Sequence, residues 1–580
     1  MSDPVNPLIV QSDLTVLLET ATPKAADGQR ELARFAELLK APEHVHTYRI
    51  SALSLWNAAA AGLTADDVCQ VLHDYAKYPV AASVDDEVVE MMGRYGRLWL
   101  TRAGGDLVLA SDDPLLLDEV SGHRQVRELL GRRVDDHTIS VREGDRGAVK
   151  QALLACGWPP ADEAGFLDGD ILAAAEITAR LRPYQADAVD RWWRDGGQSG
   201  GNGVVVLPCG AGKTVVGLAA MAAARANTLV VCTTVSSIRQ WMHEAIDKTR
   251  LTADDLGEWS GRRKQLRPVT FVTYQSLVWS DPSSSEGDGI DARHPNLRLF
   301  DEQGWGLIIY DEVHLLPAPV FRATARIQAV RRLGLTATLI REDGREGDIF
   351  SLIGPKRYDA PWLELEAAGW IAPAVCTEVR VALGDDTRRR YADAEPRSRY
   401  KVAATAGEKL AVVDRLVERH RDDRVLVIGQ YVDQLRAVAE RLDAPLLTGR
   451  TSQRRRDELF DGFRSGRIRL LVVSKVANFS IDLPEASVAI QVSGQFGSRQ
   501  EEAQRLGRIL RPKSDGRQAN FYTVVAADTD DSRFARNRQR FLAEQGYAYS
   551  IVDAADDTAD DPATDHVHRS FIDDRPAGRP

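Results

Sequence analysis

A glycine-rich loop with the composition of a phosphate-binding site follows the apolar run Val204–Leu207. The loop consists of Pro208, Cys209, Gly210, Ala211, Gly212, Lys213 and Thr214. Between a strand and a helix, the backbone N–H groups of such a loop surround phosphate oxygens at the positive end of the helix. The Lys213 ammonium would reach the β- and γ-phosphates, and the Thr214 hydroxyl would bind Mg²⁺. Although Leu207 replaces the first glycine of the general pattern, this context predicts a nucleotide site rather than an ordinary turn with an exposed lysine.

Two adjacent carboxylates, Asp311 and Glu312, end the apolar run Leu307–Tyr310 about a hundred residues later. Adjacent acids at a strand end are often merely solvated. Together with the phosphate loop, however, Asp311 is expected to bind the metal and Glu312 to deprotonate the attacking water, as ATP hydrolysis requires. His314 is either a surface histidine or a link between the nucleotide and a second ligand.

Two arginines in the segment Gln504–Arg511 could act on the same phosphate. Arg508 and Arg511 are three residues apart, so on a helix they share one face. Fixed guanidinium groups could neutralise charge that develops on the γ-phosphate, as arginine fingers do. The alternative is a solvated basic helix face.

The elements that must position these residues are short, nearly continuous apolar runs, which are typical of strands buried on both faces of a parallel sheet. A first series begins near 204, 228, 270, 306 and 332, and a second begins near 424, 468, 488 and 519. We therefore predict two tandem α/β domains with parallel sheets. Smaller patterns precede them: a strand-like alternation at 8–18, two helices within 52–78 with Thr64 as an N-cap, and a mixed α+β pattern from 98 to 157.

The chain length of 580 residues corresponds to about four domains at about 150 residues each. The predicted divisions are an N-terminal strand and helix module (1–97), a small α+β module (98–175), a first α/β domain (176–375), a basic insertion or linker (376–410), a second α/β domain (411–552) and an acidic tail (553–580).

These motifs resemble those of superfamily 2 nucleic-acid motors, and in particular the bacterial form of the XPB helicase family. The resemblance rests on Leu181-Arg-Pro-Tyr-Gln185, the phosphate loop, Asp311-Glu-Val-His314, Gly334–Asp343, Ser480–Pro484 and Gly497–Arg511, and it covers roughly residues 180 to 550. The triplet Arg341, Glu342 and Asp343 is the feature most particular to this family, in which it supports duplex opening. The resemblance implies two RecA-like domains and movement along DNA in the 3′ to 5′ sense.

By that resemblance, Arg182 and Gln185 would recognise adenine, and Thr336 and Thr338 would couple hydrolysis to movement. Asp482 would lie near the ribose, and Gln504 would help to place the water. The basic segment between the domains looks like the thumb of the family, and residues 98–157 look more loosely like its damage-recognition domain.

Hydroxyl, amide and cationic side chains that follow the predicted strands could form a nucleic-acid track. They are Thr233, Thr234, Thr273, Tyr274, Gln275, Thr451, Ser452, Gln453, Ser474 and Lys475. Each alone is more simply a helix cap or a turn residue. As a set at strand ends they favour contacts to the backbone of a strand without reading its sequence.

The formal net charge of −11 argues mildly against a polyanion partner. The segment from Asp553 to Pro580 holds eight Asp and three Arg, a net of −5, whereas Arg388–Lys401 has six cations against two acids. The acidity is therefore concentrated away from the basic segments. The five cysteines lack metal-site spacing, and the N-terminus lacks a signal sequence, so we expect a cytoplasmic protein without a membrane span, acting as a monomer.

Three functions are compatible with these residues. The first is an ATP-dependent DNA helicase or translocase that acts in repair on single strands and duplex junctions. The second is an RNA-dependent motor of the same architecture; the Arg341-Glu-Asp343 triplet favours DNA. The third is a scaffold that uses ATP as a clamp to recruit a nuclease or a transcription partner, against which the hydrolytic base Glu312 argues.

Overall fold

The computed structural model describes residues 3–40, 44–208, 210–261, 263–281, 293–328, 330–337, 346–360, 365, 368–370, 374–474, 486–494, 519–536 and 548–556. The chain divides into two compact units. The first comprises Met1–Ile371 with Glu544–Gly546, and the second comprises Ala372–Ala543 with Tyr547–Pro580. Among the described helices, none is both long and apolar enough to cross a membrane.

The N-terminal module is a four-stranded antiparallel sheet with four helices. Its sheet has the order β1-β2-β4-β3 and consists of β1 (Leu8–Val10), β2 (Thr15–Glu19), β3 (Glu37–Lys40) and β4 (Val45–Arg49). The helices are α1 (Ala25–Leu32), α2 (Ala52–Ala60), α3 (Ala65–Tyr75) and α4 (Ala82–Gly93). The predicted N-cap is confirmed, since Thr64 Oγ1 accepts the Asp67 N–H at 3.1 Å.

The small α+β module follows as a five-stranded sheet with the order β7-β8-β6-β5-β9. Its elements are β5 (Trp99–Ala103), β6 (Asp106–Ala110), α5 (Pro114–Gly122), α6 (Arg124–Arg127), β7 (Leu130–Arg133), β8 (Thr138–Val141), η1 (Glu143–Asp145), α7 (Arg146–Ala155) and β9 (Ala161–Asp162). Helix α7 also contacts the next domain: Gly147 lies so close to the backbone of Ala325 that a Cβ would come within 2.5 Å of its carbonyl oxygen.

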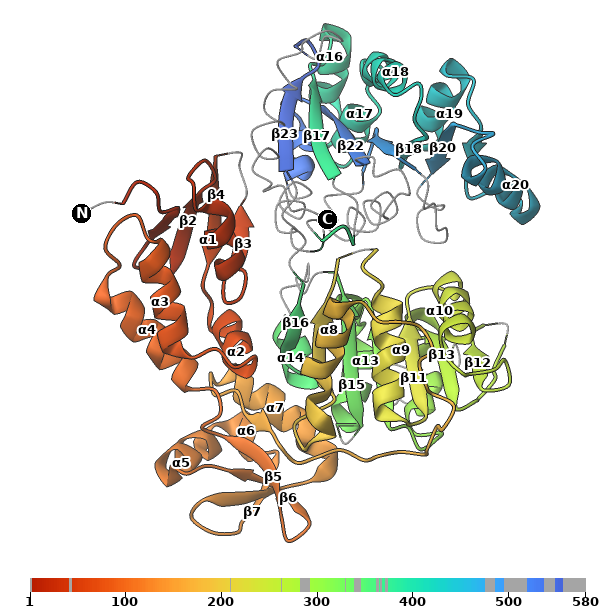
Figure 1. The fold of residues 1–580 in the computed structure, drawn as a ribbon. Coiled ribbons are helices and arrows are strands. Elements are labelled where there is room, and N and C mark those ends of the chain that lie inside the picture. The colour runs from red at the N-terminus through yellow and green to blue at the C-terminus, as the bar shows by residue number, and fades with distance from the viewer. Residues whose placement is uncertain are drawn as a thin grey trace, which may run out of the picture. The chain divides into compact units, whose positions relative to one another are not determined.

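The first α/β domain is built on a parallel sheet, as predicted (Figure 1). The sheet has seven strands in the order β12-β13-β11-β14-β15-β10-β16, of which β12 and β16 were not predicted. Its strands are β10 (Asn202–Val206), β11 (Thr228–Cys232), β12 (Leu256–Trp259), β13 (Val269–Thr273), β14 (Leu307–Asp311), β15 (Arg331–Thr336) and β16 (Lys356–Asp359). The helices are α8 (Pro183–Trp193), η2 (Arg194–Gly196), α9 (Lys213–Ala224), α10 (Val235–Lys248), α11 (Tyr274–Leu277), η3 (Pro295–Phe300), η4 (Val313–Leu315), α13 (Ala318–Arg326) and α14 (Glu346–Leu352).

Strand β16 ends the strand order, so one of its sides has no neighbouring strand. Helix α2 of the N-terminal module contacts that strand. The Lys356 N–H donates to Asn57 Oδ1 at 2.9 Å, and Arg357 Nη1 donates to the Ala60 carbonyl at 3.1 Å. The N-terminal module therefore supplies a partner for one backbone N–H of this last strand and for the Arg357 side chain.

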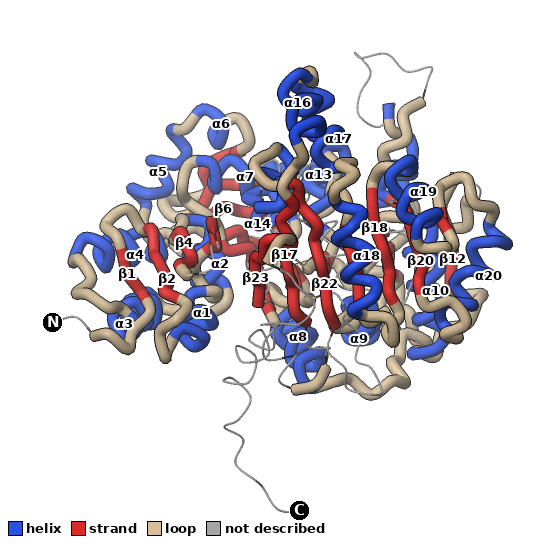
Figure 2. The backbone as a smooth tube through the Cα atoms, turned by 90° about the horizontal axis from the view of Figure 1, so that it is seen from above, coloured by secondary structure: helices blue, strands red, loops and turns tan. Residues whose placement is uncertain are grey.

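The second α/β domain also has a seven-stranded parallel sheet, with the order β19-β20-β18-β21-β22-β17-β23. Its strands are β17 (Ala374–Val381), β18 (Val425–Gly429), β19 (Leu446–Leu447), β20 (Leu470–Ser474), β21 (Val488–Gln491), β22 (Ala519–Ala526) and β23 (Ala548–Asp553). Its helices are α16 (Asp385–Asp393), α17 (Pro396–Ala404), α18 (Lys409–Arg419), α19 (Val432–Arg441) and α20 (Gln453–Arg464). Figure 2 shows α18 and α19 lying along this sheet.

The basic segment 376–410 contributes a strand to this sheet. Strand β17 pairs with β22 on one side and β23 on the other. The two helices α16 and α17, which carry all the arginines of this segment except Arg380 of β17, follow β17 directly. The segment is therefore joined to the second domain by a full strand and not by flexible ends alone.

Candidate active site

Parallel strands bring their carboxyl ends to one edge of the first sheet, and the predicted residues of this domain gather there. The phosphate loop follows β10, and the two acids lie at the end of β14. Thr336 ends β15, which lies between these two strands. Residues separated by more than a hundred positions in the sequence thus share one edge.

The phosphate loop has the backbone conformation that its glycines allow. Gly210 and Gly212 have φ angles of +83° and +82°, a region that residues with a Cβ rarely adopt. Helix α9 begins at Lys213, so its N-terminal N–H groups and positive dipole end face the loop. A Cβ on Gly212 would also lie 2.6 Å from Gln185 Nε2, so a larger residue would displace that side chain as well as strain the backbone.

The segment before α8 holds the loop from the other side. Tyr184 Oη and Gln185 Nε2 both donate to the Ala211 carbonyl, at 2.7 and 3.0 Å. Arg182 donates to Tyr184 Oη at 3.1 Å, and its guanidinium lies 4.9 Å from the ring centroid of Trp370. Of the two expected adenine-binding residues, Gln185 therefore contacts the loop directly, whereas Arg182 is linked to it through Tyr184. Trp370 adds a flat aromatic surface beside Arg182.

An ion pair joins the two halves of the site. Lys213 Nζ lies 2.6 Å from Glu312 Oε1, and both side chains are largely buried. Burial raises the pKa of Glu312, but the charges of Lys213 and His314 outweigh burial and leave that pKa below its ordinary value. Glu312 is thus an anion paired with the lysine that is expected to bind phosphate.

Two aromatic side chains bind the neighbouring acid, one at its carboxylate and one at its backbone carbonyl. Trp241 Nε1 donates to Asp311 Oδ2 at 3.1 Å, and Tyr274 Oη donates to the Asp311 backbone carbonyl at 3.0 Å. Burial, and then the charge of Glu312, raise the pKa of Asp311 to about 6. Asp311 is therefore the more easily protonated of the two acids.

The oxygen donors at this edge fit Mg²⁺. Asp311 supplies a carboxylate, and Thr214 supplies a half-buried hydroxyl as the second residue of α9. Over the described ranges, no group of three or more His, Cys, Asp or Glu could enclose a metal ion. Mg²⁺ commonly keeps water and uses one or two protein oxygens together with substrate phosphates, so two donors suffice here.

We predict that Mg²⁺-dependent nucleotide binding strengthens as the pH rises through about 6. Asp311 must lose its proton to bind the ion, so below that pH the apparent Mg²⁺ affinity should fall by about tenfold per pH unit. Fluorescence titration of an ATP analogue with Mg²⁺ between pH 5 and 8 measures this midpoint. Because ATP also titrates in this range, Glu312→Gln is the control: removing the neighbouring charge should move the midpoint to lower pH. An identical midpoint in both proteins would contradict the assignment.

His314 connects the ends of two strands. His314 Nδ1 lies 2.7 Å from Thr336 Oγ1, and both residues are buried. The Thr336 carbonyl in turn accepts the Leu207 N–H at 2.9 Å, next to the phosphate loop. His314 is therefore an internal link within the site and not a surface histidine.

The predicted track residues of the first domain form helix caps near the same edge. Thr234 Oγ1 accepts the Ser237 N–H at the start of α10, and Thr273 Oγ1 accepts the Ser276 N–H at the start of α11. Thr233 Oγ1 lies 3.2 Å from Ser237 Oγ. The threonines thus have the local capping roles considered as the alternative. Thr273 and Tyr274 are buried, whereas Thr233 and Thr234 are half-buried and Gln275 is exposed.

In the second domain, Ser452 caps α20 and Thr451 Oγ1 accepts the Thr448 N–H at 3.0 Å. Ser474 ends β20 with a buried hydroxyl that has no partner among the described residues. The remaining predictions lie outside the described residues: Cys209, Thr338, Arg341, Glu342, Asp343, Lys475, Asp482, Gln504, Arg508, Arg511 and the side chain of Gln453.

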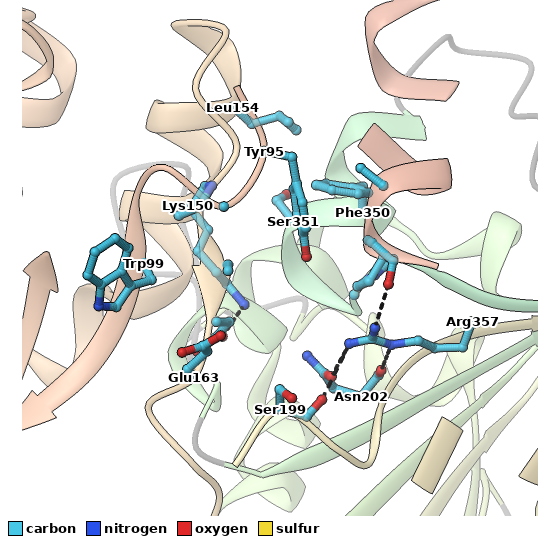
Figure 3. Close-up of a pocket in the computed structure, with 18 of the residues that line it drawn as sticks. Tyr95, Trp99, Lys150, Leu154, Glu163, Ser199, Asn202, Phe350, Ser351 and Arg357 are labelled. Carbon is cyan, nitrogen blue, oxygen red and sulfur yellow. Dashed lines mark hydrogen bonds and ion pairs between the residues drawn. The ribbon is translucent and has the colours of Figure 1, made fainter. Parts of the chain in front are cut away.

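A separate cavity of about 360 Å³ lies where the two N-terminal modules meet the first α/β domain (Figure 3). Its lining includes Tyr95, Lys150, Phe350 and Arg357. The Arg357 guanidinium donates to the carbonyls of Ala60, Ser199 and Asn202, so its cation joins segments of the chain. Among the lining residues of the described structure, none belongs to the predicted nucleotide or nucleic-acid sets.

Three family models match this chain. One described as the ERCC3/RAD25/XPB C-terminal helicase matches residues 365–571, and one described as the type III restriction enzyme, res subunit, matches residues 178–341. A third, described as a helicase conserved C-terminal domain, matches residues 8–135.

Curated relatives match almost the whole chain. A protein of Kineococcus radiotolerans named DNA 3′-5′ helicase XPB is 56% identical over 564 residues, which cover 97% of this chain and 99% of the relative. A protein of the same name from Mycobacterium tuberculosis is 55% identical and covers 95% and 98%. The general transcription and DNA repair factor IIH helicase/translocase subunit XPB of Antonospora locustae is 34% identical, over 94% of this chain and 82% of the relative.

Proposed function

This chain belongs to the XPB family of helicases, and on that premise we propose that it is an ATP-driven DNA helicase that moves in the 3′ to 5′ sense and acts in DNA repair. The observation that carries the proposal is the pairing of Lys213 with Glu312 at 2.6 Å beside Asp311, at the edge of a RecA-like parallel sheet. This arrangement places a phosphate-binding cation, a base and a metal ligand together.

Hydrolysis follows from the roles of these side chains. When ATP binds, Lys213 moves from Glu312 to the β- and γ-phosphates. The Glu312 carboxylate, no longer paired with Lys213, orients a water molecule and accepts its proton as the water attacks the γ-phosphorus. Asp311 and Thr214 would hold Mg²⁺, which neutralises charge on the phosphate oxygens. Gln185 and Arg182 would position the base of the nucleotide, with Trp370 beside it.

We propose further roles for residues of the second domain, for the coupling residues of the first domain and for the N-terminal modules. Arg508 and Arg511 would stabilise charge at the γ-phosphate, Gln504 would help to place the water, and Asp482 would lie near the ribose. The affinity of the enzyme for a DNA strand would depend on the state of the nucleotide, and this dependence would be transmitted by Thr336, Thr338 and His314. Arg341, Glu342 and Asp343 would support duplex opening, and the modules 1–97 and 98–175 would orient the substrate.

We further propose that the enzyme is monomeric and cytoplasmic and that it hands DNA to a nuclease. The alternatives are an RNA-dependent motor and a non-hydrolysing scaffold. The names of the bacterial relatives favour DNA over RNA, and the buried base Glu312 favours hydrolysis over a clamp.

Single-stranded DNA is expected to stimulate ATP hydrolysis at least about fivefold more than RNA of the same length, since a backbone track orders the motor when it is occupied. Steady-state hydrolysis with matched DNA and RNA oligonucleotides measures this preference. Selective stimulation by RNA would overturn the choice of DNA. In strand-displacement assays, 3′-tailed duplexes should be opened in preference to 5′-tailed ones, with bubble duplexes as a further substrate.

A further inference from the structure

Trp241 contacts Asp311, although tryptophan is not one of the residue types that the expected phosphate and metal chemistry requires. Its indole N–H donates to Asp311 Oδ2 at 3.1 Å across 70 residues of sequence, and its side chain is 2% exposed. An indole N–H is a donor only, so the Asp311 oxygen that it contacts must act as the acceptor. The bond therefore orients Asp311 with one oxygen occupied.

The ring of Trp241 is fitted against the helix of the phosphate loop. A Cβ on Gly217 of α9 would lie 2.4 Å from Trp241 Cη2, so this contact requires glycine. On its other side the ring lies 6.5 Å from that of Phe271 in β13, centroid to centroid. Tight packing in a protein interior fixes a side chain in one rotamer, so the donor is held in place before any ion binds.

Trp241 belongs to a helix that begins at a predicted nucleic-acid contact. Thr234 caps α10 and lies seven residues, about two helical turns, before Trp241. Tyr274, which binds the Asp311 carbonyl, likewise begins a helix, and that helix is capped by the predicted contact Thr273. The two aromatic donors that hold Asp311 thus come from helices whose N-termini carry the track residues.

We propose that Trp241 is a positioning residue that aligns the Asp311 carboxylate for Mg²⁺ and couples a DNA strand at the N-terminus of α10 to the metal site. The proposal rests on the proposed function, because it takes Asp311 as the metal ligand and α10 as part of the DNA track. Mutation of residues that orient a metal ligand through hydrogen bonds typically lowers metal affinity by about 10–100-fold.

The test compares Trp241→Phe with the matched variant Trp192→Phe. Trp192 is also fully buried in the first domain, and its Nε1 donates at 3.2 Å to the Arg332 carbonyl, which is not part of the site. Both variants lose a buried indole donor and a similar volume. Equilibrium binding of a fluorescent ATP analogue is titrated with Mg²⁺, with thermal denaturation of each protein alongside.

Trp241→Phe is expected to raise the half-saturating Mg²⁺ concentration by about tenfold or more, with unchanged nucleotide affinity in excess EDTA. Trp192→Phe should lose thermal stability and keep the wild-type Mg²⁺ response. Equal Mg²⁺ responses in Trp241→Phe and the wild type would overturn the proposal. If phenylalanine impairs folding, 3-benzothienylalanine at position 241 keeps the ring shape and replaces the N–H donor by sulfur, with the same expected and contradicting results.

Adding a single-stranded oligodeoxynucleotide tests the coupling between DNA and the metal site separately from the proposed ATPase function. In the wild type, the oligonucleotide should lower the half-saturating Mg²⁺ concentration, and in Trp241→Phe this decrease should disappear. A variant that responds to DNA like the wild type would overturn the coupling. A wild type whose nucleotide binding ignores Mg²⁺ altogether would instead contradict the proposed ATPase site.

Discussion

Replacing Lys213 by alanine is expected to lower kcat for ATP hydrolysis by about 10²–10³-fold or more, because the γ-phosphate loses its fixed cation in a largely buried site. The variant also leaves Glu312 without its ion-pair partner, so some loss of thermal stability should accompany the loss of turnover. Steady-state hydrolysis at saturating DNA measures the effect.

The matched control is Lys248→Ala, which removes a lysine from the last turn of α10, where its partner is the exposed neighbour Asp247. This variant should hydrolyse ATP at close to the wild-type rate. A Lys213→Ala enzyme within tenfold of the wild type would contradict the assignment of the phosphate loop.

Replacing Glu312 by glutamine is expected to separate binding from hydrolysis. The carboxamide keeps the shape of the side chain and an acceptor oxygen for Lys213, but it cannot take the proton of the attacking water. We therefore expect kcat to fall by about 10²–10⁴-fold. The dissociation constant for ATP should change by less than about threefold.

Rapid-quench hydrolysis and equilibrium nucleotide binding measure the two quantities separately. Glu302→Gln is the control, since Glu302 pairs with Arg298 in an exposed part of the same domain. An active Glu312→Gln enzyme would show that another group accepts the proton.

The strands that could be predicted are those whose burial is continuous. Strands β10, β11, β13, β14 and β15 are buried along almost their whole length, so their apolar runs are visible in the sequence. Strand β17 was not predicted, because it alternates and carries Glu378. That carboxylate is 1% exposed, and it is satisfied by Arg380 at 2.8 Å and by Tyr549 Oη at 2.8 Å from the adjacent strand. The contact between Glu378 and Tyr549 cannot be predicted from the sequence, because it depends on which strands are neighbours.

The residues of the site likewise include some that could be predicted from the sequence and some that could not. The loop at 208–214 and the acids 311 and 312 could be predicted, because phosphate and metal chemistry demand those residue types beside each other in sequence. Trp241 and Trp370 were missed, because each reaches the site through tertiary packing. Tyr184 lies within the motif Leu181–Gln185, but no role was predicted for it. Trp370 meets Arg182 from 188 positions away, and no spacing rule reports such a contact.

The covered edge of β16 has a consequence for shortened forms of this chain. Asn57 and Ala60 bind the Lys356 N–H and the Arg357 side chain on the side of the sheet that lacks a strand. A chain reduced to residues 98–580 would uncover that edge and offer it to strands of other molecules, so it should form oligomers that grow with concentration. We therefore expect the first hundred residues to limit association of the motor through this strand. If this truncation weakened DNA processing, the weakening would therefore combine two effects: a loss of solubility and a loss of substrate selection.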